Sequence, residues 1–290
     1  MGTKIEWADE VWNPVTGCSK VSPGCAHCYA ERLATTRLVG KPGYTGLPWT
    51  PENAAVNVVL RPDRLDQPLR WRKPSRVFVN SMSDLFHELV PYQYLDRVFL
   101  TMALASHHRF LVLTKRPERM RGYLSDPATL GRLMLRLAEA ARMTGMEMRS
   151  EFADDGLDGV RLRNVWLGTS VENQHWADVR LPPLLDTPAA VRFLSVEPLL
   201  GPIEFSDATN APDLRERLGR PALEGIDWII VGGESGPGRR EMDPAWLASI
   251  AAQADAAGVA LFVKQDSGPR SGLRGRIPDA LWARKEYPRA

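Results

Sequence analysis

The sequence predicts an α/β protein in which about six or seven strands form a full or partial parallel (β/α) barrel. Short apolar runs rich in β-branched residues alternate with segments of helical periodicity along most of the 290 residues. Alternation of this kind is typical of a parallel sheet covered by helices. The apolar runs are also continuous, as in strands that are buried on both faces. We therefore expect a single domain over residues 1–290, long enough to bury one large core.

The composition is that of an ordinary globular protein, with 44% hydrophobic and 25% charged residues. Lys and Arg number 37 against 35 Asp and Glu, so any affinity for nucleic acid has to come from a local basic patch. The N-terminus lacks an apolar signal region, and no apolar run approaches the length that crosses a bilayer. We expect a cytoplasmic protein with no membrane partner.

The N-terminal quarter is expected to contain little regular structure. Residues 5–16 alternate loosely and predict a short strand that leads into a loop containing cysteines. Residues 29–38 predict a helix, because their apolar side chains are spaced for one buried face. Residues 39–75 are rich in Pro, Gly and Trp and predict an irregular crossover, with a short strand at 56–60.

A regular strand–helix rhythm begins at residue 76 and continues almost to the C-terminus. Two irregular insertions interrupt it, at residues 144–163 and 201–224. A doubly wound open sheet is the alternative fold, although no G-x-G-x-x-G motif opens its first helix. The expected strands span residues 76–80, 110–113, 165–168, 191–194, 227–231 and 260–263, and the expected helices span 91–105, 117–124, 127–143 and 244–257.

Polar side chains follow nearly every expected strand. In a βα barrel the carboxyl ends of the strands meet on one face, where active sites lie. A single cluster would simply mark a loop, but six in series favour one shared site. The clusters are Ser81, Ser83 and Asp84; Thr114 and Lys115; Thr169, Ser170 and Glu172; Ser195 and Glu197; Glu234 and Ser235; and Lys264 and Gln265.

All three cysteines of the chain lie within eleven positions, at Cys18, Cys25 and Cys28. Thiolates in such a cluster suit zinc or an iron–sulfur cluster. The odd count excludes a disulfide framework, and a redox pair of Cys25 and Cys28 would leave Cys18 unexplained. Three sulfur ligands require either a fourth ligand, such as a histidine in a zinc site, or a metal with an open position. Both alternatives stay open from the residues alone.

Six sequence blocks together resemble a known family. The chain is similar to a phage-associated three-Cys-motif family of radical S-adenosylmethionine-like proteins, and the similarity covers nearly its whole length. The blocks are GCSKVSPGCAHCYAE at 17–31, SMSDLFHE at 81–88, LTKRPERM at 113–120, GTSVENQ at 168–174, SVEPLLGPI at 195–203 and VGGESGPGRR at 231–240.

This resemblance implies a radical S-adenosylmethionine enzyme with a partial TIM barrel. Cys18, Cys25 and Cys28 would be the metal-binding residues, holding a [4Fe-4S] cluster with one open iron. The enzyme would reductively cleave S-adenosylmethionine to a 5′-deoxyadenosyl radical that abstracts hydrogen from a substrate. The implied electron donor is a flavodoxin or ferredoxin, and the expected substrate is a nucleotide or a nucleic acid base.

Two features depart from the superfamily pattern. The cysteines have the spacing C-x6-C-x2-C instead of C-x3-C-x2-C, and a bulge at Pro23-Gly24 can absorb the three extra residues. The GGE element at 232–234 follows a late strand, whereas in the superfamily it follows the second strand. With these departures, the residues expected to bind the cofactor are Ser81, Ser83, Asp84, Lys115, Ser170, Glu172, Glu197, Gly232, Gly233, Glu234 and Lys264.

Basic and aromatic residues in the expected loops suggest how a nucleic acid could bind. Tryptophans at 49, 71 and 282 lie in irregular segments where a base could stack. An ordinary solvated surface is the alternative interpretation of the basic residues. The alternative function is a zinc- or cluster-stabilised nucleic-acid-binding protein without S-adenosylmethionine cleavage. The basic residues concerned are Lys115, Arg116, Arg239, Arg240, Lys264, Arg270, Arg274 and Arg276.

Overall fold

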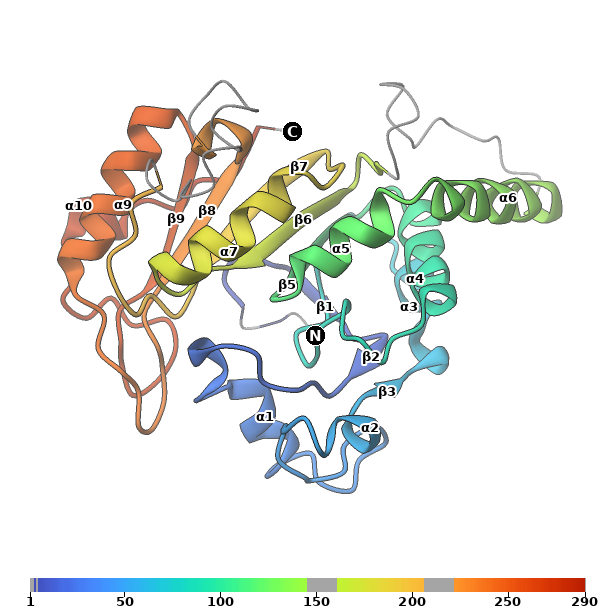
Figure 1. Ribbon diagram of the computed structural model, residues 1–290, viewed down its shortest axis with the longest axis horizontal. Helices are drawn as coiled ribbons and strands as arrows, with labels where there is room; N and C mark the ends of the chain where they lie inside the picture. The colour runs from blue at the N-terminus through green and yellow to red at the C-terminus, as the bar shows by residue number, and fades with distance from the viewer. Residues whose placement is uncertain (1–2, 4, 145–160, 206–221, 290) are drawn as a thin grey trace. The chain divides into compact units, whose positions relative to one another are not determined.

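The computed structural model describes residues 3, 5–144, 161–205 and 222–289, in which strands and helices alternate (Figure 1). Seven strands form one sheet in the order β1-β4-β5-β6-β7-β8-β9. They are β1 (Glu10–Trp12), β4 (Arg76–Val79), β5 (Arg109–Thr114), β6 (Val165–Ser170), β7 (Val191–Val196), β8 (Trp228–Gly232) and β9 (Ala260–Gln265). The fold is therefore a partial parallel (β/α) barrel, and the predicted fold class is confirmed.

The remaining elements are helices and one small antiparallel pair, β2 (Val15–Thr16) with β3 (Val59–Leu60). The α-helices are α1 (Tyr29–Ala34), α2 (Ala54–Asn57), α3 (Gln67–Arg70), α4 (Tyr92–Leu104), α5 (Pro117–Leu124), α6 (Pro127–Thr144), α7 (Gln174–Leu185), α9 (Pro244–Ala257) and α10 (Asp279–Trp282). Short 3₁₀ turns are η1 (Pro23–Cys25), η2 (Pro62–Arg64) and η3 (Ala222–Gly225). In the described part of the chain, every helix is too short or too polar to span a membrane.

The strands are parallel because apolar residues occupy both of their faces. Every residue of β6 and of β8 is buried, as expected where helices cover both sides of a sheet. β4 pairs in parallel with β1 and with β5, and β8 pairs in parallel with β7 and with β9. Within the described residues, β1 and β9 are the edges of this sheet.

Two local expectations need correction. Residues 56–60 do not form one strand, because the amide groups of Asn57 and Val58 donate back to Asn53 and Ala54 and close the short helix α2 before β3 begins. The helix expected at 29–38 ends at Ala34. The expected insertions at 144–163 and 201–224 fall largely on residues 145–160 and 206–221, which lie outside the described residues.

The helix α7 is an element that the sequence pattern does not predict. It contains Pro182 and Pro183, which normally disfavour a helix interior, and it buries the charged Arg180. The side chain of Asn173 caps its N-terminus by accepting a hydrogen bond from the Trp176 amide at 3.2 Å. A proline pair and a buried charge together hide the apolar periodicity that would have indicated this helix.

The chain folds as two compact units, and each is described by itself. The first comprises Met1–Lys20, Ala30–Leu167 and Thr187–Ala190, and the second comprises Val21–Tyr29, Gly168–Asp186 and Val191–Ala290. The expectation of a single domain stays a prediction.

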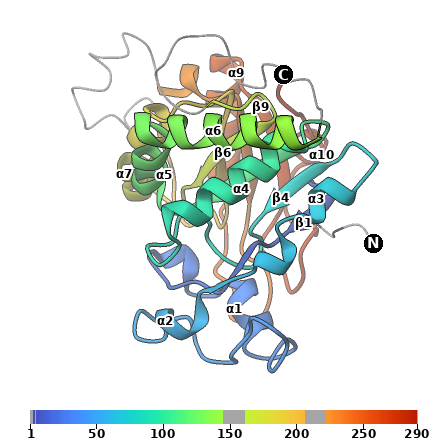
Figure 2. The ribbon, with the colours of Figure 1, turned by 90° about the vertical axis from the view of Figure 1, so that its right-hand side faces the viewer.

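One buried carboxylate joins three helices of the first unit. Helix α6 lies alongside α4, as Figure 2 shows. Asp96 of α4 is fully buried and accepts hydrogen bonds from the Tyr123 hydroxyl of α5 at 2.9 Å and from Nε of Arg132 of α6 at 2.8 Å. Burial, and then the charge of Asp96, raise the pKa of Tyr123, so its hydroxyl stays protonated and keeps donating.

In the second unit, α9 packs against β9 (Figure 1). Asp243 caps this helix by accepting a hydrogen bond from the Ala245 amide at 2.8 Å, and Gly258 ends it in the left-handed conformation. Trp228 of β8 stands edge-on to Phe262 of β9, with ring centroids 6.2 Å apart. These contacts make the β8–β9 region a firm support for the loops that follow the two strands.

Gly17, immediately before the first cysteine, provides a test of the fold. Its φ is +79°, and a Cβ there would lie 1.9 Å from the carbonyl oxygen of Asn57. Gly40 has a similar φ of +75°, but a Cβ there would meet nothing within 4 Å. Gly40→Ala should cost about 1–2 kcal/mol from backbone strain alone. Gly17→Ala should cost about 1–3 kcal/mol more, because the backbone must move.

Urea unfolding followed by circular dichroism measures both free energies of unfolding. Equal losses for the two variants would contradict the close packing of residue 17 against residue 57.

Candidate functional site

The three cysteines are half-buried, and none of them forms a disulfide. Cys18 belongs to the first compact unit, and Cys25 and Cys28 belong to the second. Within the described residues, no group of three or more His, Cys, Asp or Glu side chains is arranged to hold a metal ion. Thiols are donors of the type that a soft metal prefers. The residues that hold Cys18 lie in the first unit, and those that hold Cys25 and His27 lie in the second.

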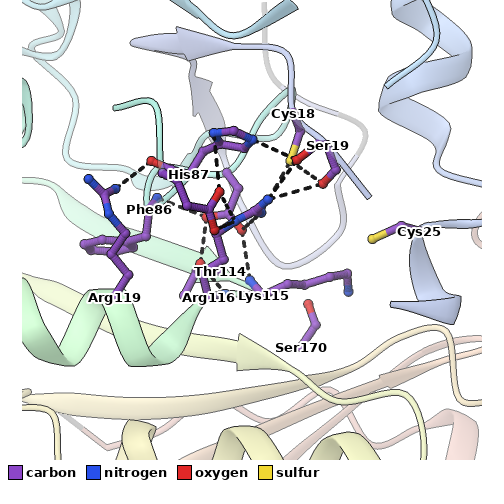
Figure 3. Close-up of polar contacts among 12 residues, drawn as sticks. Cys18, Ser19, Cys25, Phe86, His87, Thr114, Lys115, Arg116, Arg119 and Ser170 are labelled. Carbon is purple, nitrogen blue, oxygen red and sulfur yellow. Dashed lines mark hydrogen bonds and ion pairs between the residues drawn. The ribbon is translucent and has the colours of Figure 1, made fainter. Parts of the chain in front are cut away.

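In the first unit, the guanidinium of Arg116 holds the residues around Cys18 (Figure 3). Nη1 donates to the sulfur of Cys18 at 3.7 Å, and Nη2 donates to the hydroxyl of Ser19 at 3.1 Å. Nη1 also donates to Asp84 at 3.2 Å, and Nε donates to both oxygens of Glu88, at 2.8 and 3.0 Å. Arg116 is only 7% exposed, so a largely buried cation is surrounded by two carboxylates and a sulfur.

The charges around Arg116 keep it ionised. Burial lowers the pKa of its guanidinium, but the charges of Asp84, Cys18 and Glu88 outweigh burial and raise the pKa above its ordinary value. The guanidinium therefore remains a donor toward the sulfur of Cys18 at every accessible pH.

Asp84 connects the ends of β4 and β5. Its carboxylate accepts hydrogen bonds from the hydroxyl of Thr114 at 2.6 Å and from the amides of Lys115 and Phe86 at 3.1 and 3.0 Å. With the guanidinium of Arg116, four groups donate to this one buried carboxylate. Asp84 therefore has a structural role, and the contact of Lys115 with it is made by the backbone amide.

The succession of Ser19, His87 and Glu88 resembles a catalytic nucleophile, its general base and an orienting carboxylate. The directions of the hydrogen bonds exclude that role. The Leu89 amide donates to Nδ1 of His87 at 3.2 Å, so the proton of the neutral ring is on Nε2. That nitrogen lies 2.9 Å from the Ser19 hydroxyl and donates to it. Burial, and then the charge of Arg116, lower the pKa of His87 and keep it neutral. The trio positions the loop and does not activate Ser19.

Ser81 and Ser83 also hold the segment that leads to Cys18. The Ser81 hydroxyl donates to Oδ1 of Asn13 at 3.3 Å, and the Ser83 hydroxyl donates to the carbonyl of Val15 at 2.8 Å. The Gly17 amide donates to the carbonyl of Met82 at 2.9 Å. Four of the residues expected to bind the cofactor, Ser81, Ser83, Asp84 and Lys115, therefore belong to one anchoring network in the first unit.

In the second unit, Glu172 holds the turn before Cys25. It is completely buried and pairs with Arg180 at 2.9 Å, and it accepts a hydrogen bond from the Ser22 hydroxyl at 2.7 Å. Ser22 in turn lies 3.8 Å from the sulfur of Cys25. A Cβ on Gly24 would come within 2.4 Å of Glu172, so the turn fits closely against this carboxylate. Arg180 also donates to the backbone oxygen of Ser170, at 2.8 Å.

Glu234 holds the other part of the same segment. One of its oxygens lies 2.9 Å from Nδ1 of His27, between Cys25 and Cys28 in the chain. Arg240 donates to Glu234 through its amide, Nε and Nη2, and Nη2 also donates to the carbonyl of Pro23 at 3.0 Å. Burial raises the pKa of the Glu234 carboxyl, but the hydrogen bonds from Arg240 and His27 prevail and lower it to about 2.

Glu197 and Lys264 form a separate pair at the ends of β7 and β9. Nζ of Lys264 lies 2.5 Å from Oε1 of Glu197, and the two side chains are 18% and 20% exposed. Gly232 adjoins the pair, because a Cβ there would lie 3.5 Å from the Glu197 carboxyl carbon. A Cβ on Gly233 would lie 2.4 Å from the Ser267 amide, so the chain must be glycine at that point.

The expected basic rim is mostly a set of ion pairs. Arg116 is buried and Trp49 is 5% exposed, so neither can contact a nucleic acid on the surface, and both expectations are corrected. Arg240 pairs with Glu234, Arg274 with Asp279, and Arg276 with Asp266 and Glu241. The face of the Trp282 ring is covered by Lys285, whose Nζ lies 4.0 Å from its centroid. Arg239 and Arg270 are exposed, and among the described residues neither makes an ion pair.

Sequence reasoning missed the roles of Arg116, His87 and Arg180. Arg116 and Arg240 carry charge that is indistinguishable, in sequence, from that of a solvated arginine. A signal exists only for Arg116, since it lies three residues after the expected strand 110–113 and precedes Pro117, the first residue of α5.

Fold and contacts together define an α/β protein of the partial parallel barrel type, with its cysteine segment held by side chains that follow the strands. The chain belongs to the DUF5131 family, described as proteins of unknown function, whose model matches residues 2–274. No curated protein and no solved structure matches the chain. The family description carries no activity, so a function has to come from the chemistry of the site.

The low pKa of Glu234 predicts a specific acid sensitivity. A carboxyl whose folded pKa is depressed stabilises the folded state fully above its unfolded pKa of 4.5, and this stability is lost as the pH falls toward about 2. The free energy of unfolding of Glu234→Gln should therefore lie below that of the wild type by a constant amount above about pH 5. The difference should shrink as the pH falls from about 4.5 to about 2.

Chemical denaturation at a series of pH values measures this difference. Glu241→Gln is the matched control, because it removes an exposed carboxylate that pairs with Arg276. A difference for Glu234→Gln that stays constant down to pH 2.5 would contradict the assignment.

Proposed function

We propose that this protein is an iron–sulfur enzyme of the radical S-adenosylmethionine class, acting in the cytoplasm. The observation that carries the proposal is the set of three half-buried cysteines, none in a disulfide, on one eleven-residue segment that closely follows β1, the first strand of a partial parallel barrel. Cys18, Cys25 and Cys28 would hold a [4Fe-4S] cluster and leave one iron open. When bound, the cluster would supply the electron that cleaves S-adenosylmethionine and so starts hydrogen abstraction from a substrate.

The chain's own contribution is to fix the thiols and exclude water. The carboxylates of Asp84, Glu172 and Glu234 accept hydrogen bonds from Arg116, Arg180 and Arg240. Contacts with the cysteine segment come from Arg116 to Cys18, from Glu172 to Ser22 and from Arg240 to Pro23. Such buried ion pairs are costly to break, and this favours a single loop conformation. These three carboxylates therefore support the segment and are poor candidates for gripping a cofactor directly.

The pair of Glu197 and Lys264 is the better candidate for polar contact with S-adenosylmethionine. Both side chains are partly exposed and lie at the carboxyl ends of strands, Glu197 just after β7 and Lys264 near the end of β9, where ligands of parallel α/β proteins usually bind. A carboxylate can accept from the methionine amine, and an ammonium can donate to the methionine carboxylate. If a zwitterionic ligand came between Glu197 and Lys264, the one ion pair between these side chains would be replaced by two ion pairs with the ligand.

The proposed substrate is a nucleotide or a nucleic acid base, and the proposed reductant is a flavodoxin or ferredoxin. The exposed guanidinium groups of Arg239 and Arg270, both in the second unit, support a phosphate-bearing substrate. Two exposed guanidinium groups within the expected rim favour a local contact with one or two phosphates over extended binding along a nucleic acid.

A second candidate function follows from one contact. A metal-binding histidine commonly gives its other ring nitrogen to a carboxylate, and His27 makes such a contact with Glu234 at 2.9 Å. Cys18, Cys25, Cys28 and His27 would then be the ligands of a structural zinc ion in a nucleic-acid-binding protein without S-adenosylmethionine cleavage. Metal analysis separates the two candidates.

We expect the protein, purified without oxygen, to contain about four irons and four sulfides per chain. With a reductant and S-adenosylmethionine it should form 5′-deoxyadenosine. Cys18→Ser, Cys25→Ser and Cys28→Ser should each lose most of the iron and all of the product, while Arg119→Gln, which touches no cysteine, should keep both.

Iron and sulfide are quantified colorimetrically, and 5′-deoxyadenosine is quantified by chromatography. One tightly held zinc ion with no iron uptake on anaerobic reconstitution would overturn the iron–sulfur proposal and support the zinc site. Iron without product would retain the cluster and reject the cleavage reaction.

We further expect Lys264→Met to weaken S-adenosylmethionine binding to the reconstituted protein by about tenfold or more, because a charge-assisted hydrogen bond to the ligand is lost. Equilibrium dialysis measures the affinity. Lys285→Met is the matched control in the same unit, since Lys285 lies over the rings of Phe262 and Trp282. Unchanged affinity in Lys264→Met, or an equal loss in the control, would reject the pair as the binding group.

A further inference from the structure

A run of cations lies at the amino ends of β4 and β5, within the first compact unit. Residues 70–76 extend from the last residue of α3 to the first residue of β4, and they include four basic residues and no acidic one. Arg76 and Arg109, the first residues of β4 and β5, are direct neighbours in the parallel sheet. The amino-edge surface comprises Arg70, Arg72, Lys73, Arg76 and Arg109.

This surface lies at the opposite end of the strands from Cys18. β5 spans six residues, and at about 3.3 Å per residue its two ends are roughly 17 Å apart. Arg116, which contacts Cys18, follows the carboxyl end of β5, whereas Arg109 is at its amino end. A ligand on the amino-edge surface would therefore use side chains that the candidate site does not use.

Two of the five cations are neutralised within the chain. Asp66 pairs with Arg70, and Asp9 pairs with Arg76 at 3.0 Å. Asp9 immediately precedes β1, and Glu10 begins that strand. Because β1 lies on the other side of β4 from β5, the acidic residues gather at one end of this edge and leave the other end positive.

The other three cations are exposed, and among the described residues none of them makes an ion pair. They are Arg72, Lys73 and Arg109. The guanidinium of Arg109 lies over the ring of Trp166, 5.2 Å from its centroid, and such stacking leaves the donors at the edge of the guanidinium available. Like charges on neighbouring strands repel each other, so Arg109 beside Arg76 has a cost that an anionic ligand would remove.

The loop at 71–75 is held by the residues that lead into β5. Nε2 of His107 donates to the carbonyl of Trp71 at 2.8 Å, and the Arg109 amide donates to the carbonyl of Ser75 at 2.9 Å. Both ends of the loop are therefore fixed to the same strand. An anion would meet charges whose backbone is already ordered, and this lowers the entropic cost of binding.

We propose that the amino-edge surface binds the phosphate backbone of a nucleic acid. Interfaces with nucleic acid are polar and strongly positive, as this surface is. An interface with an acidic protein would need an apolar centre, and the exposed large apolar side chain next to the loop is Leu69 alone in the chain segment 67–76. Half-buried Trp71, between Arg70 and Arg72, adds an aromatic ring of the kind on which a base can stack.

This inference goes beyond the proposed function and does not depend on it. The proposed substrate contacts are Arg239 and Arg270 in the second unit, whereas the amino-edge surface belongs wholly to the first. Contacts with phosphates carry no sequence information, so we expect binding that depends strongly on salt and little on sequence.

The experiment is fluorescence anisotropy of the full chain at a series of potassium chloride concentrations. The probes are a labelled oligodeoxythymidine and a labelled duplex of the same length. Each lost phosphate contact reduces the slope of log K against log salt by about 0.7 for a single strand and about 0.9 for a duplex. The double variant Arg72→Gln with Lys73→Gln should therefore reduce the slope by about 1.4 or about 1.8, respectively.

The matched control is Arg37→Gln with Lys41→Gln. It removes the same charge from two exposed residues of the same unit, between α1 and α2, and should leave the slope unchanged. A second double variant, Arg72→Lys with Lys73→Arg, keeps both charges and should keep the slope of the wild type. Circular dichroism checks that each variant is folded.

A reduced slope for either probe, confined to Arg72→Gln with Lys73→Gln, supports the inference, and the probe with the larger change identifies the preferred strand form. No binding to either probe would overturn it and leave an acidic protein as the partner of these charges. An equal change in the control would also overturn it, because net charge alone would then explain the binding. A change seen only in Arg239→Gln with Arg270→Gln would overturn the inference and leave the proposed function standing.

Discussion

A buried guanidinium that must satisfy all of its donors is the constraint on which the Cys18 part of the structure depends. Arg116 cannot lose its charge, and at 7% exposure it cannot rely on water. Its donors are directed in a fixed plane, so Asp84, Glu88 and Ser19 have to occupy defined positions around it. The sulfur of Cys18 takes one of these positions. The location of a reactive group is thereby fixed by the electrostatic needs of a residue that has no reactivity of its own.

In the second unit the buried charges that hold the cysteine segment have the opposite sign. Here the buried groups are carboxylates, Glu172 and Glu234, and arginines from their own unit neutralise them. Each carboxylate has a lone pair left for the cysteine segment and uses it on Ser22 or His27. Acidic side chains at the ends of parallel strands are usually regarded as ligand-binding groups. In this protein several of them have a partner within the chain and act as supports.

Because of these internal pairs, fewer charged side chains at the strand ends are left to contact a ligand. Among the charged candidates in the described residues, Glu197 and Lys264 combine a position at the end of a strand with partial exposure of both side chains. Gly232 adjoins this pair, since a Cβ there would lie 3.5 Å from the Glu197 carboxyl carbon. A small zwitterion suits such a place better than a polyanion. The wider basic rim is largely neutralised by neighbouring carboxylates.

The sequence by itself determined the parallel α/β fold, the strands from residue 76 onward and helices such as α5 and α9, because hydrophobic periodicity and caps are local signals. It also determined that the thiols of Cys18, Cys25 and Cys28 lie on one short segment. Only the tertiary structure decided which polar residues are free to meet a ligand. Asp84 and Glu197 are equivalent as residues that follow a strand, yet one has Arg116 against it and the other has the partly exposed Lys264. Partners 32 and 67 positions away in the chain decide burial and charge, and no local pattern records them.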